Sequence, residues 1–227
     1  MTEWMSPATV SGIGVALLAA ALTAALVFSG RGSRGHEWPL AAVALGGLAF
    51  QCVHFVEHGL QLGYWFRNMD AAPWLTPWAA TAADGLTWGC SWVVTGKPSI
   101  GVELLHLLGN GIFLAGLAGT WLLARKAGTA PTRSLKAVMW LQSAHVAEHV
   151  LLTVTVLSAG RALGFSTGFG AMPDAWVATY RIWFHFTVNL GATALALLAV
   201  TQMAKGGTLG IGQWQLPWRN DTATRTA

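Results

Sequence analysis

The chain has 227 residues, of which 54% are hydrophobic and only 10% are charged, and its formal net charge at pH 7 is +4. A water-soluble globule of this composition would lack the polar surface to cover itself, so an aqueous protein is excluded and the main solvent is lipid. The basic excess flanks apolar segments instead of forming one patch, which argues against a nucleic-acid partner.

Five apolar stretches are long enough to cross about 30 Å of hydrocarbon, and they predict an all-α integral membrane protein with about five transmembrane helices. No Lys or Arg precedes the first stretch, which argues against a cleaved signal peptide. Most Lys and Arg lie in the linkers 30–37 and 125–136 and after Lys205, so we expect a bacterial-type plasma membrane with the N-terminus outside and the C-terminus in the cytoplasm. The five stretches are 8–29, 38–64, 99–124, 136–159 and 178–204.

The linker 65–98 separates the second and third stretches and is rich in tryptophan and proline. Indole rings favour the membrane interface, so this linker is predicted to form short amphipathic helices on the outer surface. In that position it would cover an apolar entrance for a lipid-soluble substrate.

A duplicated motif marks the second and fourth stretches. Residues 51–58 read Gln-Cys-Val-His-Phe-Val-Glu-His, and residues 142–149 read Gln-Ser-Ala-His-Val-Ala-Glu-His. The following stretches share a His-x-x-x-Asn pattern, at His106 and at His185. The chain therefore reads as two tandem helix-hairpin repeats. The predicted division is an N-terminal helix with its basic inner linker at 1–37, a first repeat at 38–124, a second at 125–205, and an interfacial or disordered tail at 206–227.

Helix geometry places each motif on one face. At about 100° per residue, positions i, i+3, i+6 and i+7 fall within one arc, and so do positions i and i+4. Counted from the predicted helix ends, the six histidines of the motifs all lie in the outer half of the bilayer. Exposing such groups to lipid is costly, so the four helices of the repeats are expected to form a bundle that turns them inward.

A transition-metal site is the most economical way to satisfy these side chains. Close helical His and Glu spacing is typical of carboxylate-bridged two-metal bundles, so we expect two ions, with iron favoured and zinc or copper as alternatives. Glu57 and Glu148 are expected to bridge the ions or move protons as the catalytic residues. The predicted ligands are His54, Glu57, His58, His106, His145, Glu148, His149 and His185. Amides that would orient these ligands are Gln51, Asn110, Gln142 and Asn189.

The function predicted from this site is that of a metal-dependent membrane oxidoreductase acting on oxygen or on a lipid-soluble substrate such as a quinone. A haem b electron-transfer protein is an alternative, because paired histidines on facing helices also hold haem. A proton or metal-ion transporter is another, since chains of His and Glu conduct protons. The inner halves of the helices are nearly all apolar, however, and supply no second half of a conduction path. A polar network that only joins the helices is the purely structural interpretation.

Two families share parts of the pattern. Histidines in membrane helices are similar to those of the membrane di-iron desaturases and hydroxylases, whose boxes hold more paired histidines. The H-x-x-E-H string resembles the inverted zinc-protease motif, in which two His bind zinc and Glu is the base. That resemblance implies a zinc-dependent membrane hydrolase as a further alternative, with Glu57 or Glu148 as base. Two copies, each with an added His-x-x-x-Asn helix, depart from the protease pattern.

Overall fold

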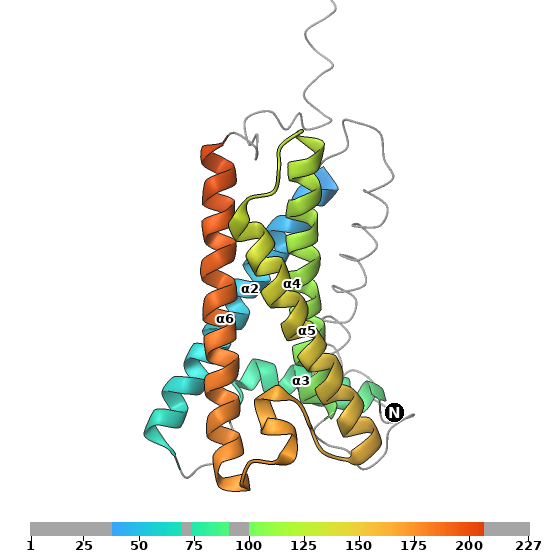
Figure 1. The fold of residues 1–227 in the computed structure, drawn as a ribbon. Coiled ribbons are helices and arrows are strands. Elements are labelled where there is room, and N and C mark those ends of the chain that lie inside the picture. Colours follow the sequence, from blue (N-terminus) through green and yellow to red (C-terminus); the bar gives the residue numbers. More distant parts are fainter. Residues whose placement is uncertain (1–37, 70–73, 91–99, 207–227) are drawn as a thin grey trace, which may run out of the picture.

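The computed structural model of the chain describes residues 38–69, 74–90 and 100–206, and these residues are all-helical without any strand (Figure 1). The predicted helix at 8–29, the linker 30–37 and the tail from 207 onward lie outside the described residues. The elements in chain order are α2 (Trp38–Arg67), α3 (Pro77–Cys90), α4 (Ile100–Lys126), α5 (Arg133–Ala159), the 3-10 helix η2 (Phe165–Gly170) and α6 (Asp174–Lys205).

Three of the described helices are long and apolar enough to cross a membrane: Pro39–Arg67, Ile100–Lys126 and Trp176–Lys205. They coincide with three of the predicted spans. Helices of this length and composition are expected in a membrane protein. Helix α5 matches the predicted span at 136–159 in position, and its 27 residues would suffice in length. It is not among the three, and its middle carries the polar residues Gln142, His145, Glu148 and His149, which lower its hydropathy.

The four long helices alternate in direction along the chain (Figure 1). Helix α2 packs against α4 and α6, and α5 packs against the same two helices. The connection 127–132 joins α4 to α5 at one end of the molecule, whereas α3 and η2 lie together at the other end (Figure 1). Consequently the two helices that carry the repeated Q-x-x-H-x-x-E-H string face each other across α4 and α6.

Glycine allows α2 and α4 to approach closely. A Cβ atom at position 47 would lie 2.6 Å from the Cα of Gly116, and one at Gly119 would lie 3.2 Å from the backbone oxygen of Leu40. Membrane helices associate through such close backbone contacts, because lipid supplies no hydrophobic force that would press them together. This contact fixes the first helix pair.

Helix α3 occupies part of the predicted outer linker and packs on α4. Its alanine face, with Leu86, is buried against Leu105 of α4. The helix therefore covers the end of α4. It also contains tryptophans, a residue type that favours the membrane interface. Cys90 is its last residue.

The buried interior is divided into an apolar half and a polar half. Toward the 127–132 connection, α4, α5 and α6 form a dry core around Phe113, with Leu135, Val138 and Met203. Toward α3 and η2 lie the buried histidines and their polar neighbours. Since the buried ionisable groups of the described residues are confined to one half, the candidate site lies toward one end of the molecule.

Candidate metal centre

All six histidines of the repeated motifs lie in one cluster within the polar half. His106 is partly buried, and the others are at most 7% exposed. They come from four helices: His54 and His58 from α2, His106 from α4, His145 and His149 from α5, and His185 from α6. The spacing argument therefore identified the correct faces of all four helices.

The first three rings form a triad. The Nε2 atoms of His54 and His58 lie 3.3 Å apart, as their i, i+4 spacing allows. The ring centroid of His106 is 5.8 Å from that of His54 and 5.6 Å from that of His58. Two adjacent helices thus converge on one point with three imidazoles.

The second triad has the same composition and is the more compact of the two. The Nε2 atoms of His145 and His149 lie 3.2 Å apart, and the His185 centroid is 5.6 Å and 5.0 Å from those two rings. One nitrogen from each ring can be chosen so that all three lie within 4.8 Å of one another. This is the separation expected of groups that could share a metal ion.

The two triads touch through near-parallel rings. The His58 and His185 centroids are 5.8 Å apart with planes inclined by 15°, and those of His106 and His149 are 5.3 Å apart with planes inclined by 14°. Each contact joins one triad to the other, and the two contacts are equivalent under exchange of the repeats. The six imidazoles therefore form one continuous centre with two matched halves.

Hydrogen bonds fix which ring nitrogen faces the centre. The Nδ1 atoms of His106 and His185 each lie 2.8 Å from a backbone carbonyl, of Val102 and Arg181 respectively. A carbonyl only accepts, so Nδ1 carries the proton and the Nε2 lone pair is free. The Nε2 atom of His185 is buried and has no hydrogen-bond partner. Metal-binding imidazoles are typically held in this way by their other nitrogen.

His58 is held through a side chain instead. The amide nitrogen of Gln61 donates to Glu57, which leaves the Gln61 oxygen to accept from Nδ1 of His58 at 3.0 Å. The Nε2 atom of His58 is then unprotonated and faces Nε2 of His54. Two nitrogens bound to one tetrahedral ion at about 2.0–2.1 Å lie about 3.3 Å apart, so the observed Nε2 pairs fit an ion between them.

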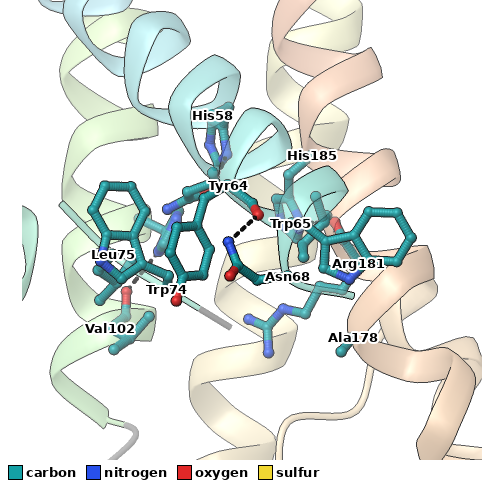
Figure 2. Close-up of a pocket in the computed structure, with 13 residues that line it drawn as sticks. His58, Tyr64, Trp65, Asn68, Trp74, Leu75, Val102, Ala178, Arg181 and His185 are labelled. Atoms are coloured by element: carbon teal, nitrogen blue, oxygen red, sulfur yellow. Dashed lines mark hydrogen bonds between the residues drawn. The ribbon is translucent and has the colours of Figure 1, made fainter. Parts of the chain in front are cut away.

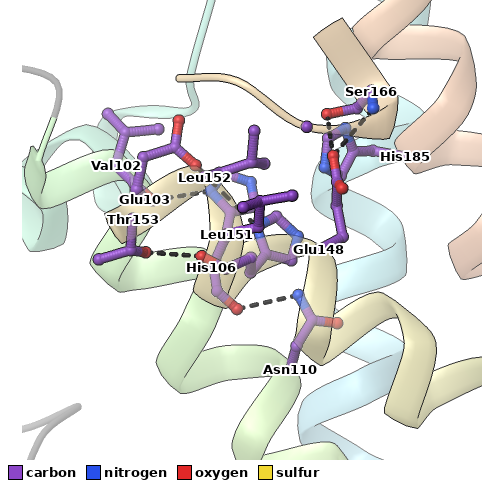
Figure 3. A network of polar contacts seen from close by, with 12 residues as sticks. Val102, Glu103, His106, Asn110, Glu148, Leu151, Leu152, Thr153, Ser166 and His185 are labelled. Carbon is purple, nitrogen blue, oxygen red and sulfur yellow. Dashed lines mark hydrogen bonds and ion pairs between the residues drawn. The ribbon is translucent and has the colours of Figure 1, made fainter. Parts of the chain in front are cut away.

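The glutamine and asparagine side chains join the two halves crosswise. The Gln51 amide nitrogen of α2 donates to Oδ1 of Asn189 on α6 at 3.0 Å, and that of Gln142 on α5 donates to Oδ1 of Asn110 on α4 at 2.8 Å. Each asparagine in turn donates to the backbone oxygen of the histidine one turn earlier, as Figure 3 shows for Asn110 and His106. These amides join the histidine-bearing helices, and none of these hydrogen bonds involves an imidazole ring.

Glu57 and Glu148, for which the sequence suggested a bridging role, hydrogen-bond to loop residues in the structure. The Glu57 carboxylate accepts from both the backbone nitrogen and the hydroxyl of Thr76. Glu148 accepts from the same two groups of Ser166, at 2.8 and 2.7 Å, and from the backbone nitrogen of Phe165 (Figure 3). The one close group of three metal-ligand side chains found among the described residues contains histidines only. Each glutamate lies at the edge of the helix face that carries the histidines. From this position its side chain reaches the loop.

Glu103 is the buried acid that faces the histidines. Its Oε2 lies 4.0 Å from Nδ1 of His149, and its Oε1 accepts from the guanidinium of Arg181. The sequence analysis did not single out Arg181. Its position within an apolar span was a usable signal, because an ionisable residue there requires a partner.

A cavity of about 200 Å³ lies beside the cluster (Figure 2). His58, His106 and His185 line its inner end, and Asn68 at the end of α2 lies at its exposed end. Aromatic rings form much of the wall between them, including Tyr64 stacked on Trp74 with centroids 4.9 Å apart. The histidine cluster is therefore accessible to a small molecule from the end that carries α3.

The chain belongs to a family of unknown function, DUF6008, whose model matches residues 2–221. No curated protein and no solved structure matches the chain significantly.

Proposed function

We propose that this member of the DUF6008 family binds two transition-metal ions in its six-histidine cluster and acts as a membrane oxidoreductase. One observation carries the proposal. Six imidazoles from four helices meet in two matched triads, and hydrogen bonds at Nδ1 direct free Nε2 lone pairs toward the centre. The Nε2 atoms of His58, His106 and His185 are therefore acceptors, and a bound metal ion would satisfy such lone pairs.

The donor set bears on the identity of the metal. Since Glu57 and Glu148 are engaged by the loops, the remaining ligands are neutral imidazoles. Imidazole suits copper, zinc and iron, and copper binds most tightly to a given nitrogen site, whereas carboxylates are typical of di-iron centres. The geometry thus favours copper over the iron that the sequence suggested. Two adjacent redox-active ions would supply one-electron steps for a substrate such as oxygen or a quinone.

The same contacts support a repeat architecture. We interpret α2 with α4, and α5 with α6, as two helix-hairpin repeats that pack into a four-helix bundle. Two crosswise amide bonds and two stacked histidine pairs join the halves, and the two members of each set are equivalent under exchange of the repeats, as pseudo-twofold symmetry requires. In the predicted topology the site would lie toward the outer face of the membrane.

The alternatives fit the site less well. A haem needs a flat slot between opposed imidazoles, but the neighbouring rings of this cluster lie with centroids 4.7–6.0 Å apart. A transporter needs a path to the opposite side, and the described helices fill that half with an apolar core. A zinc hydrolase of the inverted-protease type needs a free glutamate base, whereas both motif glutamates accept hydrogen bonds from the loops.

Metal analysis of the protein purified in detergent tests the proposal directly. We expect about two transition-metal ions per chain, in line with other two-metal bundles, and about one in each of His54→Ala and His145→Ala. The seventh histidine, His36, lies outside both motifs, so His36→Ala is the matched control and should retain both ions. A metal-free wild-type protein after loading, or full occupancy in both triad variants, would contradict the proposal. A strong Soret band would favour haem instead.

A further inference from the structure

The cavity beside the cluster is built from two helix stripes. On α2, Gln61, Tyr64 and Asn68 follow His58 at helical spacing, and on α6, Ala178, Arg181 and Ile182 precede His185 in the same way. Both stripes lead from the exposed end of the cavity to the histidines (Figure 2).

The size of the cavity limits the ligand to one ring. A cavity of about 150 Å³ is enough to hold benzene. This one measures about 200 Å³, which leaves room for one or two small substituents. A lipid chain or a fused ring system would have to remain largely outside.

The walls favour a flat aromatic molecule. Tyr64, Trp65 and Trp74 line the cavity, and stacked or edge-on contacts with such rings favour a planar π system. Arg181 is the permanently charged residue of the lining, and its charge is balanced by Glu103. A neutral ring therefore suits this wall better than a carboxylate, which would need an unpaired cation.

The inner end of the cavity is polar, and one buried nitrogen there has no hydrogen-bond partner. His185 is 4% exposed, lines the cavity, and its Nε2 has no hydrogen-bond partner. With ions held by these imidazoles, a hydroxyl oxygen on the ring would supply a further ligand at this end, which a purely apolar ring lacks. The polar and apolar ends of the cavity thus correspond to the two ends of a phenol.

From these four features we infer that the cavity is a binding site for single-ring phenols, including hydroquinones, with the hydroxyl directed at His58, His106 and His185. This inference rests on the proposed function, because it names the substrate class of the same centre. It assigns the aromatic wall to the ring and the histidine end to the hydroxyl.

Cobalt-loaded protein provides a test that does not depend on turnover. The visible absorption bands of bound cobalt report on the histidine centre, so they respond to a ligand there and not to phenol dissolved in detergent. We expect phenol to change these bands saturably in the wild type. Toluene has the same ring without a hydroxyl and should require at least tenfold higher concentration for any effect.

Two substitutions on α6 distinguish phenol binding in the cavity from a general effect on the protein. Ala178→Phe places a ring inside the cavity and should weaken phenol binding at least tenfold while cobalt content stays unchanged. Leu190, on the same helix, is 44% exposed, so Leu190→Phe is the matched control and should bind phenol like the wild type.

The outcomes distinguish this inference from the function on which it rests. Two bound cobalt ions with bands that phenol does not change would overturn the phenol site and leave the metal centre standing. Equal effects of phenol and toluene, or unaltered phenol binding in Ala178→Phe, would also overturn it. Failure of the wild type to bind cobalt would overturn both proposals.

Discussion

The Oε2 atom of Glu103 lies 4.0 Å from Nδ1 of His149, while Oε1 of the same carboxylate accepts from Arg181. The equivalent histidine of the first repeat, His58, is held by Gln61 instead. A carboxylate behind a metal-binding imidazole raises its basicity, whereas a neutral amide does so less. The two triads therefore share a geometry but differ in their electrostatic support.

This difference predicts unequal metal affinities. Glu103→Gln keeps the side-chain shape and removes a charge 4.0 Å from His149 that makes no hydrogen bond to it, so it should weaken metal binding at the triad of His145, His149 and His185 by at most about tenfold, the lower end of the range for hydrogen-bonded partners. Competitive titration with a chelator of known affinity measures the change. The triad of His54, His58 and His106 should keep its affinity.

Gln61→Leu is the reciprocal variant. It removes the acceptor for Nδ1 of His58 and should weaken only the first triad. If Glu103→Gln and Gln61→Leu each weaken the binding of both ions equally, Glu103 and Gln61 do not support separate triads.

Loss of the motif glutamates should loosen the outer loops without removing metal. In Glu57→Gln or Glu148→Gln, an amide nitrogen replaces one oxygen that accepts from Thr76 or Ser166. Each variant should lose about 1–3 kcal/mol of stability, because buried donors are left unpaired. Thermal unfolding in detergent measures this loss. Elemental analysis should still find the wild-type metal content, and a lost ion would restore the glutamates as ligands.

The glycine contact between α2 and α4 should be intolerant of a methyl group. In Gly47→Ala, the added Cβ would lie 2.6 Å from Gly116 Cα, so the two backbones must separate at a cost of about 1–3 kcal/mol. Gly111 lies on α4 with open space around its Cα, so Gly111→Ala should cause no loss of stability. Gly47→Ala should melt at a lower temperature than Gly111→Ala. Equal melting temperatures would mean that the close approach of α2 and α4 is not needed for stability.

The crosswise amide bonds should be energetically coupled between helices. Gln51→Leu and Asn189→Leu each remove one side of the bond that joins α2 to α6. Interhelical hydrogen bonds of this kind contribute about 1 kcal/mol, so a double-mutant cycle should show coupling of that size. Pairing Gln51→Leu with Asn110→Leu provides the control, because those side chains belong to different bonds. Additive effects in the first cycle would contradict a direct bond.

The histidine positions could be predicted because helix periodicity is a local property. His54 and His58 must share a face of any regular helix, and a polar face in an apolar helix must turn toward protein. By contrast, the Thr76 groups that donate to Glu57 lie in a loop nineteen residues away, and no periodicity relates a helix to the loop that folds over it.

By itself, the sequence determined the apolar helices, their polar faces and the six imidazoles that those faces carry, since each depends only on residue type and spacing along a helix. The tertiary structure alone decided that Glu103 and Arg181 pair across α4 and α6, that the motif glutamates hold the loops, and that a ring-sized cavity reaches the histidines. These features depend on which side chains of different helices come within a few ångströms, and that is set by packing between helices.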